Sequence, residues 1–370
     1  MNIILFLLVY IIAILFYSIW LYNQVKMFYK PLFYIKNGKK IDVHSLYPEF
    51  AVKDKLSFIR IFIGNLLFFP WKILLPVLIS MVFNLHLNYY NKTLKNSTTD
   101  PKERKIITSL TSFYTNILFI LMNFKIIEKK VEYEKVYKKY LGEDYDFNQQ
   151  DYSIMISNHI GFYEIIYNMV YNYTGFIAKK DVANYYFVGV LAKGINCLFV
   201  DRESEESRKK IFDELEERQK LYYKKELLTP LCLFPEGTTT TGNHILKFKK
   251  GAFFALLPIK PQILDIYHED EFHLAIGVAP VVSNWLRSGN YSRHRIYHID
   301  LPVINPTQFM FEKYKDLGNE KWEIFSEVTR KIMCEVSGLK PSNKNYRDMK
   351  KYLNSIINGK YEEDIDIKQD

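Results

Sequence analysis

Long apolar runs are concentrated in the first third of the chain. Residues 3–22 are apolar except for Ser18, and no charged residue occurs before Lys26. A run of this length can cross the hydrocarbon core of a bilayer. No basic residue precedes it and no small-residue cleavage site closes it, which favours a retained anchor over a cleaved signal peptide. Residues 1–25 are therefore predicted to form a transmembrane anchor, and the lysines that follow predict that the remainder lies on the cytoplasmic side.

Two more apolar regions follow a linker at residues 26–56. The first, residues 61–87, is split by Lys72 and interrupted by Pro70 and Pro76. It is predicted to form a re-entrant hairpin or a pair of interfacial helices, and a single kinked span is the competing interpretation. The second, residues 106–124, is uncharged but rich in Ser and Thr, which favours an amphipathic helix on the membrane surface. Residues 57–124 are thus expected to form a membrane-associated unit with an apolar hairpin.

From about residue 125 the pattern changes to short apolar runs that alternate with amphipathic or charged stretches. This pattern is typical of an α/β domain, which we place at residues 125–340, followed by a charged tail at residues 341–370. The expected strands are 154–156, 176–180, 196–200, 231–235, 274–282 and 295–303. The expected helices are 162–173, 182–191, 203–225 and 322–336.

Composition narrows the classes of function. Hydrophobic residues make up 48% and aromatic residues 16% of the 370 residues, so the chain is not disordered. A net charge of +9 suits an anionic membrane surface or an anionic ligand. No recognition helix, zinc spacing or aromatic RNA-binding signature supports a nucleic-acid partner. The three cysteines are widely spaced, which indicates a reducing compartment and neither a disulfide framework nor a metal site.

The candidate chemistry follows the strand predicted at residues 154–156. His159 comes just after its carboxyl end, where open α/β sheets place their ligands. Glu164 falls in the first turns of the next helix, close enough to reach the imidazole. A histidine that a carboxylate orients can remove a proton from a hydroxyl near pH 7. Taken alone, this pair is a weak signal, because a single histidine at a strand end is more often structural.

Three later stretches strengthen that signal: Gly194–Arg202, Phe234–Gly242 with Glu236-Gly237-Thr238, and Leu257–Pro261. In this order, after His159 and Glu164, they resemble the four blocks of the glycerolipid acyltransferases. The resemblance covers roughly residues 55–340 and is greatest to the lysophosphatidylcholine acyltransferase-type branch. It implies a mixed sheet flanked by helices, with an N-terminal membrane anchor and an apolar hairpin.

The resemblance also implies roles for individual residues. His159 would be the general base and Glu164 would orient it. Arg202 would bind the phosphate of the acceptor, while Glu236, Gly237 and Thr238 would line the acceptor pocket. Lys249 and Lys250 would contact the phosphates of CoA or a lipid headgroup, although a solvated basic edge is an equal alternative. The surface ion pairs of Arg202 and a plain turn at Glu236–Thr238 are the corresponding structural interpretations.

The implied activity is transfer of a fatty acyl group from acyl-CoA to the free hydroxyl of a lysophospholipid. Acyl-CoA would be a co-substrate, with no further cofactor and no metal, and the protein would reside in the endoplasmic reticulum. An acceptor of the glycerol 3-phosphate or lysophosphatidic acid type is the alternative within the class. The family's usual acid is Asp, and this chain has Glu164. That departure also permits a catalytically silent, lipid-binding relative.

Overall fold

The protein is built on a mixed sheet, as the resemblance implied. The computed structural model describes residues 3–52, 55–184, 188–201, 205–268, 272–273 and 277–361. The strand order is β3–β11–β9–β4–β7, with β10 paired to β9. Strands β4, β7 and β9 are parallel, β11 is antiparallel to β9, and β3 is parallel to β11. The bounds are β3 Phe124–Glu128, β4 Ile154–Ser157, β7 Cys232–Leu233, β9 Ile259–His268, β10 Phe272–His273 and β11 His294–Asp300.

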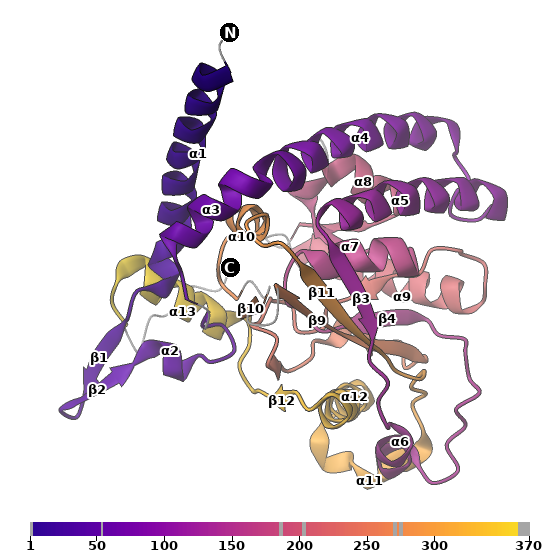
Figure 1. The fold of residues 1–370 in the computed structure, drawn as a ribbon. Helices are drawn as coiled ribbons and strands as arrows, with labels where there is room; N and C mark the ends of the chain where they lie inside the picture. Colours follow the sequence, from indigo (N-terminus) through magenta and orange to yellow (C-terminus); the bar gives the residue numbers. More distant parts are fainter. Residues whose placement is uncertain are drawn as a thin grey trace.

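Helices cover both faces of this sheet (Figure 1). The long strand β9 shows why, because Ile263 packs into the core beneath α12 while its neighbour Leu264 packs into the core beneath α5 and α7. One face carries α6 (Glu134–Leu141), α11 (Gln308–Lys313), η6 (Lys315–Leu317) and α12 (Lys321–Ser337). The other carries α5 (Pro101–Leu121), α7 (Tyr163–Tyr167) and η3 (Asn168–Asn172).

Smaller elements complete the α/β domain. The strands expected at residues 176–180 and 196–200 form β5 (Ile177–Lys179) and β6 (Leu198–Val200), which pair with each other in a separate sheet. The surrounding elements are η4 (Lys180–Asn184), α8 (Val188–Gly194), α9 (Glu205–Tyr223), β8 (His244–Ile245), η5 (Lys250–Ala252) and β12 (Lys340–Pro341). The prediction of a strand at residues 274–282 is wrong for residues 277–282, the part of that range that the structure describes. Residues 277–280 form a turn and α10 (Val281–Ser288) follows, because Pro280 and a stripe of apolar positions favour a helix start there.

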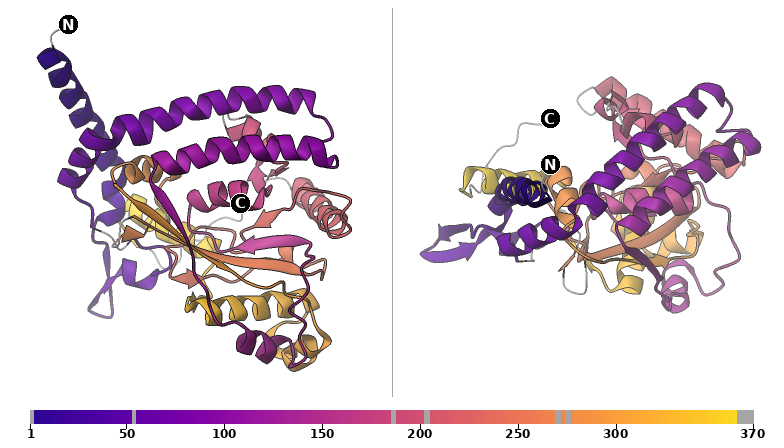
Figure 2. Two further views of the ribbon diagram at one scale, coloured as in Figure 1. Left: turned by 45° about the vertical axis from the view of Figure 1, so that its right-hand side comes forward. Right: turned by 45° about the horizontal axis from the view of Figure 1, so that its top comes forward.

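The helix α1 (Ile3–Val25) extends away from the domain (Figures 1 and 2). Its buried side chains Ile14, Ser18, Leu21 and Val25 form one stripe at helical spacing, and most of the large apolar side chains from Ile3 to Trp20 are exposed. Ser18 is buried because its hydroxyl accepts a hydrogen bond of 2.9 Å from the amide of Asn65 in α3. Among the described residues, two helices are long and apolar enough to cross a membrane, Ile3–Tyr29 and Phe58–Thr93.

The second of these is a single bent helix. Helix α3 (Phe58–Phe69) continues through the π-helical turn η2 (Pro70–Leu74) into α4 (Leu75–Thr93). Pro70 has no N–H for the carbonyl of Leu66, and the hydroxyl of Tyr10 in α1 donates to that carbonyl at 3.0 Å. This is the competing interpretation of the sequence, a single kinked helix, and the favoured hairpin at the two prolines is wrong. The chain turns instead at residues 94–100, between α4 and α5. Helices α4 and α5 lie side by side above the sheet (Figure 2).

A buried lysine holds the bend of this helix against the domain. Lys72 is 4% exposed, and its ammonium donates to the carbonyl oxygens of Met122, Tyr291 and Ser292 at 3.1, 2.5 and 2.9 Å. These three acceptors use all three ammonium protons. The charge that splits the apolar run in the sequence is thus satisfied by protein, and it fixes the helix relative to the sheet.

The segment after α1 is folded together with the C-terminal helix. The elements are η1 (Lys26–Tyr29), β1 (Phe33–Lys36), β2 (Lys39–Asp42), α2 (Val43–Leu46) and α13 (Tyr346–Asn358). Tyr352 of α13 is fully buried, and its hydroxyl donates to Nδ1 of His44 at 2.8 Å while Nε2–H of His44 donates to the carbonyl of Lys30. The hydroxyl of Ser342 donates to the buried carboxylate of Glu49 at 2.6 Å. The segment that follows α1 and the helix α13 therefore share one apolar core.

Replacing Lys72 by Met is expected to lower the free energy of unfolding by about 3 kcal/mol, because buried carbonyl oxygens would lose a charged donor. The measurement is the melting temperature of the full chain in detergent. Lys92→Met, which removes an exposed lysine in the last turn of α4, is the matched control and should leave the melting temperature unchanged. Equal melting temperatures for Lys72→Met and wild type would contradict this role.

Candidate active site

The position of His159 is fixed by the turn that follows β4. The side chain of Asn158 replaces a strand residue in the ladder with β9: its Nδ2 donates to the carbonyl of Leu264 at 2.8 Å, and the Leu264 N–H donates to its Oδ1 at 2.9 Å. The carbonyl of His159 accepts from the N–H of Thr240 at 2.8 Å. The backbone on both sides of the imidazole is therefore held by the neighbouring strand and loop.

His159 and Glu164 are in direct contact. Nδ1 of His159 lies 2.5 Å from Oε1 of Glu164, whose side chain is fully buried. The same oxygen accepts from the backbone N–H groups of Ile160 and Gly161, both at 2.9 Å. A carboxylate only accepts, so Nδ1 carries the proton and Nε2 is left as the basic nitrogen. The extra methylene of glutamate is accommodated because Glu164 spans the turn from the first turn of α7.

Glu236 lies beneath this pair. It is 1% exposed, and its two oxygens accept from the backbone N–H groups of His159 and Leu246, each at 2.8 Å. Burial raises the pKa of the Glu236 carboxyl to about 8, the two N–H donors lower it, and the nearby charge of Glu164 raises it. The carboxyl therefore connects the turn of His159 to the segment of Leu246. In this position it holds the histidine turn in place, and it is not among the residues that line the cavity beside His159.

The imidazole faces an open cavity. The ring of His159 stacks on Phe234 with a centroid separation of 4.2 Å and an angle of 14°, and its side chain is 20% exposed. The cavity has a volume of about 730 Å³. Its apolar wall is formed by Ile177, Val200, Ile211, Phe212, Leu215 and Leu233, and its charged side chains are Lys180, Asp181, Asp201, Lys249 and Lys350. The basic nitrogen thus meets a space with both an apolar and a charged part.

The remaining predicted site residues divide between the cavity and its surroundings. Gly237 and Lys249 line the cavity, whereas Thr238 is buried at 7% exposure. Lys250 is directed elsewhere, with its ammonium 4.4 Å from the ring centroid of Phe254 and 5.7 Å from that of Trp322. Arg202 lies outside the described residues. Of the two lysines proposed for phosphate contacts, the structure brings only Lys249 to the cavity of His159.

Gly237 is required by the lysine that crosses it. Its φ of +69° lies in the left-handed region, and a Cβ built there would be 2.3 Å from Nζ and 2.5 Å from Cε of Lys249. The backbone N–H of Lys249 donates to the carbonyl of Pro235 at 2.8 Å. The Glu236-Gly237 turn therefore provides the surface on which the Lys249 side chain lies. This turn begins two residues after Phe234, whose ring stacks on His159.

Sequence reasoning missed three contributors to this cavity. Phe234 adjoins the Glu236 block, but its stacking on His159 depends on how two strands meet. Tyr346 and Lys350 of α13 line the cavity from a segment that the sequence predicted to be a charged tail. The capping box of Asn345 and Asp348 and the buried stripe of α13 are signals that could have identified a packed helix there.

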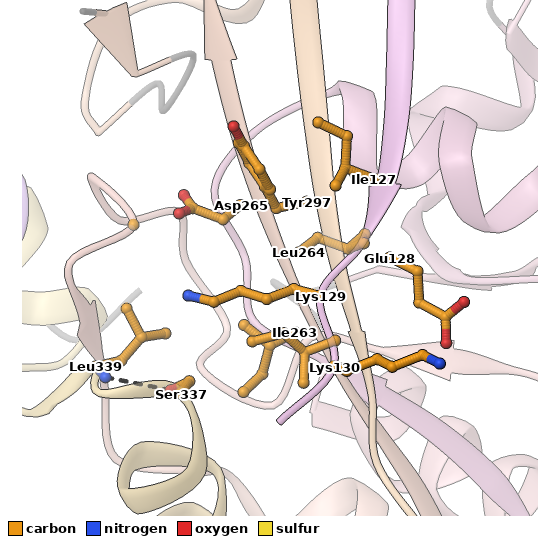
Figure 3. A pocket seen from close by; sticks show the side chains of 12 residues that line it. Ile127, Glu128, Lys129, Lys130, Ile263, Leu264, Asp265, Tyr297, Ser337 and Leu339 are labelled. Carbon is orange, nitrogen blue, oxygen red and sulfur yellow. Dashed lines mark hydrogen bonds between the residues drawn. The ribbon is translucent and has the colours of Figure 1, made fainter. Parts of the chain in front are cut away.

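A second cavity, of about 600 Å³, lies on the face of the sheet that α12 covers, next to the end of that helix. Figure 3 shows Lys129 extending from the end of β3 toward Ser337 and Leu339, with Asp265 on β9. None of its lining residues belongs to the His159 cavity. Among these described residues there is no histidine to act as a base, so the chemistry is assigned to the first cavity.

Glu236→Gln is expected to change how stability depends on pH. Between its ordinary pKa of 4.5 and the folded-state pKa of about 8, the folded protein retains a proton on Glu236 that the unfolded chain releases. Stability from this group therefore falls as pH rises through that window, by up to about 1.4 kcal/mol per pH unit. In the variant, the NH₂ group of the glutamine side chain faces the backbone N–H of either His159 or Leu246, and two donors cannot bond each other. The variant should therefore be less stable than wild type at pH 5.

The gap in melting temperature between wild type and Glu236→Gln should narrow from pH 5 to pH 8. The control is Glu143→Gln, at an exposed carboxylate, whose melting curve should stay parallel to wild type. Parallel curves for Glu236→Gln as well would show that the Glu236 carboxyl does not titrate in this window.

Part of the chain is similar to known acyltransferases. Residues 137–269 match the family model described as Acyltransferase. The lysophospholipid acyltransferase LPEAT1 of Arabidopsis thaliana is 29% identical over 216 residues, which cover 58% of this chain and 52% of that protein. Lysophosphatidylcholine acyltransferase 1 of Danio rerio is 27% identical over 161 residues, which cover 43% and 29%. The chain thus spans about half or less of the length of these relatives.

A solved structure was also found, that of the 1-acyl-sn-glycerophosphate acyltransferase PlsC from Thermotoga maritima. It has a TM-score of 0.41 and 16% identity, and the match covers 71% of this chain and 95% of that one. The family model over residues 137–269 and these relatives, together with the four ordered blocks, support the resemblance of this chain to the glycerolipid acyltransferases, and in particular to their lysophosphatidylcholine acyltransferase-type branch.

Proposed function

We propose that the protein transfers a fatty acyl group from acyl-CoA to the free hydroxyl of a lysophospholipid, with His159 as general base. The observation that carries this proposal is the contact of Nδ1 of His159 with the buried carboxylate of Glu164, beside an open cavity. Named relatives are lysophospholipid and lysophosphatidylcholine acyltransferases. Glycerol 3-phosphate and lysophosphatidic acid remain the alternative acceptors from the sequence.

The residues suffice for a direct transfer. Nε2 of His159 takes the proton of the acceptor hydroxyl, and the oxygen of that hydroxyl attacks the thioester carbonyl carbon. The tetrahedral intermediate collapses with cleavage of the C–S bond, and the thiolate of CoA takes the proton back from Nε2. Glu164 keeps the proton on Nδ1 and stabilises the imidazolium in between. No enzyme nucleophile is needed, so no acyl-enzyme forms.

The cavity offers each substrate a suitable surface. The apolar wall, with Ile211 and Leu215 of α9, suits a fatty acyl chain, and the lysines that line the cavity suit the phosphates that both substrates carry. A lysophospholipid resides in a bilayer, while acyl-CoA arrives from the aqueous phase. A domain held at the interface can receive both.

We place the protein in the endoplasmic reticulum membrane with the α/β domain in the cytosol. Support for membrane attachment comes from α1, whose exposed apolar side chains include Phe6, Phe16 and Trp20. Exposed apolar side chains on α3, η2 and α4, among them Leu67, Trp71 and Leu78, extend the same kind of surface. Lys26 and Lys30 directly after the anchor support the cytosolic orientation.

His159→Ala is expected to lower acyl transfer by at least about 100-fold, because it removes the general base. The measurement is transfer from labelled acyl-CoA to a panel of lysophospholipids and glycerol 3-phosphate, using membranes with equal amounts of each variant. His86→Ala, which removes an exposed histidine of α4 far along the chain from the site, should retain wild-type activity. Activity that survives in His159→Ala would refute the assignment of the base.

Glu164→Asp is expected to lower kcat by about 10- to 100-fold, since the carboxylate would be withdrawn by the length of one C–C bond from three donors. Glu143→Asp removes the same methylene at an exposed position and should have no effect. A silent wild type that gains activity in Glu164→Asp would instead identify a lapsed enzyme with another present role.

A further inference from the structure

The C-terminal helix α13 contributes to the candidate active site. Tyr346 and Lys350 line the same cavity as His159, although α13 begins 77 residues beyond position 269, where the match to the family model ends. The helix is held firmly, because Tyr352 is buried and bonded to His44, and the capping box of Asn345 and Asp348 fixes its first turn. The side chains that α13 presents to the cavity are therefore placed by a packed element.

Three of the cavity residues on this side form one cluster. The ring of Tyr346 lies near two ammonium groups, with its centroid 5.6 Å from Nζ of Lys249 and 5.2 Å from Nζ of Lys350. Both distances are within the range of cation–π attraction, which offsets part of the repulsion between the two lysines. The side chain of Lys249 in turn lies across Gly237. The preceding residue, Glu236, accepts a hydrogen bond from the backbone N–H of His159.

The charge of the cavity is divided between its walls. The wall formed by η4 and the end of β6 contributes Lys180, Asp181 and Asp201, which sum to one negative charge. The wall formed by Lys249 and α13 contributes two lysines and no carboxylate among the described lining residues. An anion that enters the cavity is therefore favoured on the α13 side.

We propose that Lys249, Tyr346 and Lys350 form a phosphate-binding subsite that holds a substrate next to His159. Lysine is suited to phosphate as a mobile point charge, and the Tyr346 hydroxyl adds a neutral donor. This inference rests on the proposed function, in which both acyl-CoA and the lysophospholipid carry phosphate. It assigns to α13 a direct part in recognising the substrate.

The test is equilibrium binding, which does not depend on turnover. Isothermal titration of the full chain in detergent uses two soluble probes: coenzyme A for the donor and glycerophosphocholine for the acceptor. Wild type is compared with Lys350→Gln and Tyr346→Ala. The matched control is Lys351→Gln, which removes the neighbouring lysine of α13, a residue that does not line the cavity. Lys350→Arg keeps the charge and serves as the rescue variant.

The expected result is a rise in Kd of about tenfold or more in Lys350→Gln for one probe, as for the loss of one charge-assisted hydrogen bond. Lys351→Gln and Lys350→Arg should bind like wild type. The affected probe identifies whether the phosphate belongs to the donor or the acceptor. In acyl transfer the same variant should raise the KM for that substrate and leave kcat nearly unchanged.

Three results would overturn the subsite: unchanged Kd values for both probes in Lys350→Gln, an equal loss in Lys351→Gln, or no binding of either probe by wild type. Failure of the proposed function is a separate outcome. If acyl transfer is absent while Lys350→Gln still loses affinity for a probe and Lys351→Gln does not, the phosphate subsite stands and the transfer reaction does not.

Discussion

The buried carboxylate of Glu164 is the interaction on which the site depends. One of its oxygens gathers Nδ1 of His159 and the N–H groups of two following residues, so a single group both closes the turn after β4 and selects the tautomer of the histidine. The arrangement works only if the turn itself cannot relax. Asn158, which is hydrogen-bonded to Leu264 of β9, and Glu236, which accepts from the backbone N–H of His159, provide that restraint. Chemistry and local folding are thus parts of one hydrogen-bond network.

A second constraint is the packing of two segments that are far apart in the chain. The segment between α1 and α3 and the helix α13 share a core, and the buried pair of Tyr352 and His44 lies within it. Glu49 and Thr241 connect the same segment to the loop that follows Glu236. The anchor, the C-terminal helix and the loop of the site are therefore mechanically coupled. A cavity completed by distant parts of a chain needs this kind of support.

Local patterns predicted what is local, and non-local contacts account for the rest. The strand before His159, the helix at Lys321–Ser337 and the pairing of His159 with Glu164 depend on short-range spacing, and the sequence shows them. Strand β9 was missed because Pro261 suggests an interruption. The proline is tolerated since the last β11 pair is made at Gln262, so no partner requires its missing N–H on that side. The continuous bent helix was only the competing interpretation, because the contact that supports it, from Tyr10 to the carbonyl of Leu66, joins residues far apart in the chain. The parts played by Phe234, Tyr346 and Lys350 arise only when separate segments meet.

The buried ammonium of Lys72 also bears on how the protein sits on a bilayer. Because the bend of the long apolar helix is tied by three hydrogen bonds to the loops at one end of the sheet, that helix cannot sink into lipid independently of the domain. If the exposed apolar side chains of this helix enter a bilayer, the depth that they reach also fixes the height of the sheet above the headgroups. On a bilayer, the opening of the His159 cavity would then keep one fixed height relative to the headgroups.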